Sequence, residues 1–246
     1  MRQELNYLVE QAHLLFGGYR VGPTLEVCTY CCITEEEERQ LACTEVREIS
    51  HQLLYRWNHA AKPHLPDIVE FKHFLPRFLN FVSQFQWPSH STELAFKSFK
   101  YYDRSAWTDE EFQLIDQFCR AFFTHCLQIW PIPDGSCLDD ILVMMSPTQV
   151  DVRWLLDHWS SAKNVEAALH FAKFVTSAFS LKKGIKFQNA FADEKLGLTV
   201  EEWVRNERVL AHFTERFEHF ILSDPRSSDT ARSELSYAYE WLNAYR

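Results

Sequence analysis

The sequence predicts an all-α protein that folds as a single compact domain over residues 1–246. Three observations support this prediction. Apolar residues recur at spacings of three and four along nearly every segment, giving about ten helices, and strand-like alternation is scarce. Only 6 glycines occur, fewer than the turns of a β-sandwich or a nucleotide-binding α/β fold normally use. Hydrophobic residues make up 46% of the chain and aromatic residues 15%, which suffices for a large core.

Capping residues set the expected helix boundaries. Thr34 and Glu37 have the spacing of a capping box, and Ser50, Thr108 and Thr199 are further candidate N-caps. The predicted helices cover residues 3–16, a short segment from 34, and residues 50–61, 66–86, 108–130, 136–145, 148–160, 163–181, 200–222 and 228–245. A cysteine-containing loop over residues 19–33 separates the first two helices.

The helix predicted over residues 66–86 is expected to be central. Its apolar positions, at spacings of three and four, are Ile68, Phe71, Leu75, Phe78, Val82 and Phe85. Phe74 and Phe81 widen this stripe, so more than one face of the helix should be buried. Pro76 removes one backbone hydrogen bond and should kink the helix.

A short sequence pattern that occurs twice suggests an alternative architecture. Phe85-Gln86-Trp87-Pro88 resembles Gln128-Ile129-Trp130-Pro131, and the offset falls within the range of HEAT and armadillo repeats. No third copy follows, so an ordinary irregular helical domain is preferred. Irregular helical-repeat-like stacking stays open.

The charge balance limits the possible partners. A net charge of −9 argues against nucleic-acid binding, which needs a basic surface, and favours solubility or a basic protein partner. Acidic residues also simply suit the positive ends of helix dipoles. The carboxylates expected in first helical turns are Glu35, Glu36, Glu38, Asp109, Glu110, Glu201 and Glu202.

Three features of the sequence predict the cellular location. No run of 18 apolar residues occurs, so no membrane-spanning helix is expected. The polar start of the sequence has no signal-peptide core behind it. The 7 cysteines are an odd number, which indicates reduced thiols in the cytoplasm.

Cys28 and Cys31 are the candidate site residues. Their Cys-x-x-Cys spacing can place two sulfurs on one tetrahedral Zn²⁺, and a complete site needs two more ligands. Candidates near them in the sequence are Cys32, Cys43, His51, His59, His64 and His73. No second pair with metal-ligand spacing follows, so the motif is half a site. A pair of structural thiols and a redox-active disulfide are the alternatives.

The cysteine loop also carries a resemblance. Cys28-Thr29-Tyr30-Cys31, the acidic capped helix after it and Phe74-Leu75-Pro76-Arg77-Phe78 resemble a group of uncharacterised bacterial helical proteins that carry a Cys-x-x-Cys loop. The resemblance covers roughly residues 20–85. It implies a bacterial cytoplasmic origin and no particular activity or functional residue.

No short motif identifies an enzyme. Phosphate-binding glycine loops, Gly-x-Ser-x-Gly and His-Glu-x-x-His are absent. Glu10-x-x-His13 and Glu70-x-x-His73 match half of a di-iron motif, but chance explains two such pairs in a chain with 11 histidines.

We therefore expect a non-enzymatic protein-binding or regulatory module. The first alternative is a metalloprotein with a zinc site at Cys28 and Cys31. The second is an enzyme with a pocket between helices. The sequence makes no prediction of oligomeric state.

Overall fold

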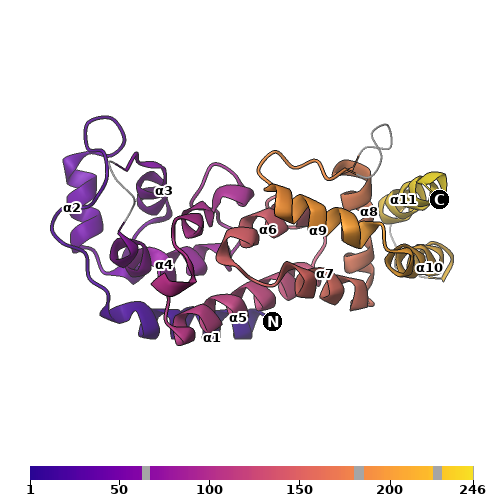
Figure 1. The fold of residues 1–246 in the computed structure, drawn as a ribbon, viewed down its shortest axis with the longest axis horizontal. Coiled ribbons are helices and arrows are strands. Elements are labelled where there is room, and N and C mark those ends of the chain that lie inside the picture. Colours follow the sequence, from indigo (N-terminus) through magenta and orange to yellow (C-terminus); the bar gives the residue numbers. More distant parts are fainter. Residues whose placement is uncertain (63–66, 180–185, 224–228, 246) are drawn as a thin grey trace. The chain divides into compact units, whose positions relative to one another are not determined.

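The computed structural model describes residues 1–62, 67–179, 186–223 and 229–245 (Figure 1). Helices make up 70% of the residues described, and pairing of the strand type is limited there to one isolated bridge between Phe179 and Phe187. The all-α prediction is confirmed. None of the helices described is both long and apolar enough to cross a bilayer. In chain order the α-helices are α1 (Arg2–Leu15), α2 (Glu35–Cys43), α3 (His51–His59), α4 (Ile68–Val82), α5 (Asp109–Cys126), α6 (Leu138–Met145), α7 (Val152–Ser161), α8 (Val165–Ser177), α9 (Glu194–Val204), α10 (Glu207–Ser223) and α11 (Asp229–Tyr245).

Local capping explains where most of these helices begin. The Thr34 hydroxyl accepts a hydrogen bond from the Glu37 amide at 3.2 Å, and the Glu37 carboxylate accepts one from the Thr34 amide at 2.8 Å. Ser50 accepts from the amide of Leu53, and Thr108 from the amide of Glu111. These side chains satisfy amides that have no partner within the first helical turn. The caps predicted at Thr34, Ser50 and Thr108 are confirmed.

The predicted cap at Thr199 is wrong. Helix α9 begins at Glu194, and its N-cap is Asp193, whose carboxylate accepts a hydrogen bond from the Leu196 amide at 2.7 Å. Thr199 lies inside α9, and its hydroxyl donates to the Lys195 carbonyl. An aspartate with a free amide three residues ahead is as good a cap as a threonine, and the glycine at 197 does not stop the helix.

Contacts divide the chain into two compact units. The first contains Met1–Phe122 and Pro147–Gln149, and the second contains Phe123–Ser146 and Val150–Arg246. Two such units can fold together or separately, so the expectation of one domain over residues 1–246 stays a prediction. The alternative of repeat-like stacking stays one as well.

Helix α4 lies at the centre of the first unit. It packs against α1 and α3 and buries 11 of its 15 residues. Phe71 and Phe78 lie on its buried side, and the Phe78 ring meets the Trp57 ring of α3 at a centroid distance of 5.7 Å. The prediction that this helix is central is confirmed, although it ends at Val82.

A buried ion pair joins α4 to the first turn of α5. Lys72 Nζ donates to Glu111 Oε2 at 2.7 Å, and both side chains are more than nine-tenths buried. The hydroxyl of Tyr19 donates to the other Glu111 oxygen at 2.6 Å. Burial acts to raise the pKa of Glu111, but the hydrogen bonds from Lys72, Tyr19 and the Thr108 amide outweigh burial, so the pKa is lowered. The carboxylate is therefore held in its charged form.

The second unit is built on interleaved aromatic rings. The Phe171 ring of α8 stacks on the Phe213 ring of α10 at 3.7 Å between centroids. Trp159 of α7 meets Trp203 of α9 at 5.4 Å, and α11 packs along α8 and α10. These rings are buried, and burial of apolar surface is the main stabilising term for such a core.

Replacing Phe78 by alanine should be among the most destabilising single changes. Phe78 is 1% exposed, and losing a buried phenylalanine side chain costs about 3–5 kcal/mol through lost transfer energy and the cavity left behind. Denaturant unfolding followed by circular dichroism measures the change. Leu14→Ala, at a position of the same unit that is 71% exposed, is the control. Equal unfolding midpoints for the two variants would contradict the assignment of Phe78 to the core.

Replacing Lys72 by methionine should destabilise the first unit by about 3–5 kcal/mol, because it leaves the Glu111 carboxylate buried without its cation. Adding Glu111→Gln should recover most of this loss, since it removes the charge, its amide oxygen can accept from the Thr108 amide and its NH2 group can donate to the Tyr19 hydroxyl. Arg39→Gln breaks the exposed pair with Glu36 and should cost less than about 1 kcal/mol. Thermal and urea unfolding of the three variants test this order, and failure of the double variant to recover would refute the charge argument.

Candidate metal centre

Apolar burial and backbone hydrogen bonds hold the cysteine loop against the first unit. Leu25, Val27 and Ile33 are buried at 8%, 8% and 2% exposure. The Cys28 amide donates to the Ala61 carbonyl just after α3 at 2.8 Å, and the Ile33 amide closes the turn on the Cys28 carbonyl at 3.2 Å. The two ends of the cysteine turn are therefore anchored.

Side chains from three helices add to this anchoring. The Glu38 carboxylate of α2 accepts from the Leu25 amide at 2.7 Å, and the Glu70 carboxylate of α4 accepts from the Glu26 amide at 2.9 Å. Arg56 of α3 donates to the Cys32 carbonyl at 2.9 Å. These contacts connect the loop that carries the thiols to α2, α3 and α4.

The turn brings together the sulfur atoms of Cys28, Cys31 and Cys32. Cys28 Sγ lies 3.5 Å from Cys31 Sγ, and Cys31 Sγ lies 3.7 Å from Cys32 Sγ. All three sulfurs fall within 4.8 Å of one another. In a tetrahedral zinc site, Zn–S bonds of about 2.3 Å place neighbouring sulfurs about 3.8 Å apart. The two shorter separations already match a shared metal ion.

Hydrogen bonds within the turn also favour the thiolate form of Cys28. Hydrogen bonds from the Cys31 amide, the Cys31 thiol and the Tyr30 amide lower the pKa of Cys28 to about 7. Hydrogen bonds to the sulfurs of Cys28 and Cys32 raise the pKa of Cys31 to about 11. The thiolate is the form that binds metals and acts as a nucleophile, and Cys28 takes this form near neutral pH.

The structure separates most of the other predicted ligands from this cluster. Cys32 joins it, whereas Cys43 and His73 line a different pocket. His51 Nε2 lies 2.9 Å from the Trp87 carbonyl, and His59 bonds to the Tyr55 carbonyl and the His90 amide. His64 lies outside the residues described. Within the described ranges, three sulfur ligands come together here.

A second group of potential ligands lies at the start of α6. Cys137, Asp139 and Asp140 place their ligand atoms within 4.8 Å of one another. Asp140 accepts from the Cys137 amide at 2.8 Å in a capping box, and Asn189 donates to both aspartates. Burial raises the pKa of Cys137 to about 11, and Cys137 supplies the one sulfur atom of this group. This group caps a helix and is a poorer metal site than the cysteine loop.

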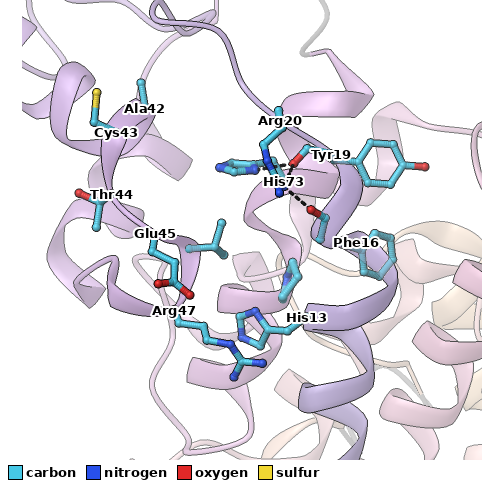
Figure 2. Close-up of a pocket in the computed structure, with 13 residues that line it drawn as sticks. His13, Phe16, Tyr19, Arg20, Ala42, Cys43, Thr44, Glu45, Arg47 and His73 are labelled. Carbon is cyan, nitrogen blue, oxygen red and sulfur yellow. Dashed lines mark hydrogen bonds between the residues drawn. The ribbon is translucent and has the colours of Figure 1, made fainter.

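No sequence motif indicates one pocket of the structure, which contains the histidines of both Glu-x-x-His pairs. His13 of α1 and His73 of α4 line it together (Figure 2). The two glutamates are not among the lining residues of the pocket: Glu10 pairs with Arg47, and Glu70 accepts a hydrogen bond from Trp57. The packing of α1 against α4 brings the two histidine side chains to the same pocket. In the sequence, their position at the edges of two apolar helix faces is the one feature that could have indicated this.

The pH dependence of alkylation should distinguish the two thiols of the Cys-x-x-Cys pair. In chelator-treated protein, the reaction of Cys28 with iodoacetamide should reach half its maximal rate near pH 7, and that of Cys31 only at about pH 11, following their pKa values. Peptide mass spectrometry of quenched samples measures each site separately. A midpoint for Cys28 at the ordinary thiol value of 9.0 would show that the turn does not favour the thiolate.

Comparison with protein-family models, with curated proteins and with solved structures finds no match to this chain.

Proposed function

We propose that this chain is a helical zinc-binding protein whose metal is held by the thiolates of Cys28, Cys31 and Cys32. The observation that supports the proposal is the convergence of three sulfurs from one turn to within 4.8 Å of one another. Zn²⁺ bound at the position that the three sulfurs surround would displace their thiol protons and stabilise all three as thiolates.

The donor set selects the class of metal. Thiolates are soft ligands that favour Zn²⁺, Cu(I) and iron–sulfur clusters over Mg²⁺ or Ca²⁺. Among these, Zn²⁺ suits a tetrahedral site with sulfurs about 3.8 Å apart. The described residues supply three ligands, and the fourth coordination position stays open for one more donor.

Disulfide formation is the competing chemistry of the same residues. All 7 cysteines are free thiols, and Cys28 and Cys31 are close enough for a small side-chain rotation to join their sulfurs. Oxidation would remove two of the three zinc ligands, so the two states exclude each other. Metal content and thiol count measured on one sample distinguish them.

The basic protein partner that the net charge suggests has weaker support than the zinc site. Several of the named carboxylates have a neighbouring arginine: Glu36 pairs with Arg39, Asp109 with Arg104, Glu201 with Arg205 and Glu202 with Arg153. This favours the interpretation that these acids serve helix dipoles and local pairs. Binding of a basic protein, a regulatory role and a cytoplasmic location stay predictions.

Zinc analysis of protein purified without added metal or chelator tests the proposal. We expect about one equivalent of zinc per chain, because three thiolates at matching spacing bind Zn²⁺ tightly. Cys28→Ser and Cys31→Ser should each reduce it to below about 0.2 equivalents. Cys43→Ser removes an exposed thiol that lies outside the cluster and should leave the zinc content unchanged.

Limited proteolysis gives the second measurement. Removal of zinc should expose the loop over residues 19–33 to cleavage before the helical core, since metal binding adds to the stability of the segment it cross-links. Wild-type protein with less than about 0.2 equivalents of metal and freely alkylated Cys28 and Cys31 would refute the zinc site.

A further inference from the structure

A surface groove lies between α10 and α11 in the second unit, whereas the cysteine cluster belongs to the first unit. The two helices pack along each other, and the groove has a volume of about 460 Å³. We call it the α10–α11 groove. Its lining residues are Glu218, Ile221, Leu222, Ser236, Tyr239 and Glu240. A groove between two packed helices is a surface on which the side chains of a third helix can pack.

The apolar side of this groove is exposed. Leu222 is 82% exposed, and Ile221 beside it is partly exposed. The other leucines of the two helices, Leu210, Leu235 and Leu242, are at most 5% exposed. A single exposed leucine needs no explanation, but this one forms part of the wall of a groove. A partner that covers Leu222 therefore removes a nearly whole leucine side chain from water.

Two exposed carboxylates, Glu218 of α10 and Glu240 of α11, line the same groove. Glu218 accepts a hydrogen bond of 2.7 Å from the Tyr239 hydroxyl, which is uncharged and leaves the negative charge uncompensated. Neither carboxylate forms an ion pair within the described ranges. The described lining residues include no lysine, arginine or histidine, so the groove attracts a cation.

The positions of these two acids differ from those of other acids in the chain. Asp109 and Glu202 each pair with an arginine. Glu35 lies in the first turn of α2, where the positive end of the helix dipole stabilises it. Glu218 and Glu240 have no such pair, and each lies in the second half of its helix, away from that positive end. Neither local pairing nor the helix dipole accounts for them.

We propose that the α10–α11 groove binds an amphipathic helix of another protein, one that carries lysine or arginine beside its apolar face. Its apolar side chains cover Leu222 and Ile221, and its cations pair with Glu218 and Glu240. The charges select the partner, because a helix with acidic residues at the same positions is repelled. A second copy of this chain fits less well, because each copy has a net charge of −9.

Three helical peptides test this assignment by fluorescence anisotropy with the full chain at neutral pH and low salt. Each has about 18 residues, enough to form a helix. The first has a leucine face and a lysine face, the second replaces lysine by glutamate, and the third replaces leucine by alanine. The leucine–lysine peptide should bind about tenfold more tightly than either of the others, because the groove offers both apolar and charged contacts. Salt at about 0.5 M should weaken this binding.

A pair of leucine variants locates the apolar contact. Leu222→Ser should weaken binding of the leucine–lysine peptide about tenfold. Leu14→Ser, at a position of the first unit that is 71% exposed, should leave binding unchanged. Both side chains are exposed, so both variants should fold, which circular dichroism checks. Cys28→Ser should bind the peptide as wild type does, which separates this groove from the zinc site.

A pair of double variants locates the charged contact. Glu218→Gln combined with Glu240→Gln should weaken binding about tenfold and reduce its dependence on salt. The glutamine oxygen at position 218 can still accept from the tyrosine hydroxyl, so the fold is kept. Glu4→Gln combined with Glu35→Gln removes the same number of charges from exposed positions of α1 and α2 and should leave binding unchanged.

Four results would overturn the assignment. One is no binding of the leucine–lysine peptide up to about 1 mM. Another is equal binding of this peptide and either of the other two. The third is an equal loss in the two double variants, which would show a general effect of net charge. The fourth is a wild-type dimer in sedimentation that Leu222→Ser converts to a monomer, which would assign the groove to a second copy of the chain.

Discussion

The charged side chains that α4 carries into the core constrain how the first unit can pack. Lys72 and Glu70 are buried at 5% and 6% exposure, and each requires a partner at a defined position. Lys72 donates hydrogen bonds to Glu111 and Tyr19, whereas Glu70 accepts hydrogen bonds from Trp57 and the Glu26 amide. A buried charge that loses its partner costs several kcal/mol, a large part of the about 5–15 kcal/mol that stabilises a domain. The partners therefore cannot shift independently.

The thiol cluster and one pocket of the first unit both depend on this helix. The bond from Glu26 to Glu70 lies two residues before Cys28, so it fixes the entry to the cysteine turn. The bond from His73 to the Tyr19 carbonyl fixes the segment after α1 that forms one wall of the pocket lined by His13 and His73. One helix thus positions a thiol cluster and a pocket through its polar side chains, while its phenylalanines pack the core. The second unit contrasts with this, because stacked rings such as Phe171 and Phe213 hold it together.

Local signals in the sequence predicted most helices and part of the thiol site. The caps at Thr34, Ser50 and Thr108 act within three residues, so neighbouring sequence is sufficient to find them. The start of α9 was misjudged because Asp193 and Thr199 are both acceptable caps. The approach of Cys28 to Cys31 was expected from their spacing. The choice of Cys32 as third sulfur depended on how the turn is clamped to Ala61 and Arg56, which no local pattern shows.

The sequence by itself determined the helical class, the central place of α4 and the clustering of thiols in one loop, because periodicity, capping and short spacing act over a few residues. Only the tertiary structure decided which buried charges pair, which histidines share a pocket and which acids are neutralised. Lys72 and Glu111 are 39 residues apart, and His73 and Tyr19 are 54 residues apart. Such contacts arise from the packing of whole helices, and the energy of pairing a buried polar group depends on the environment that this packing creates.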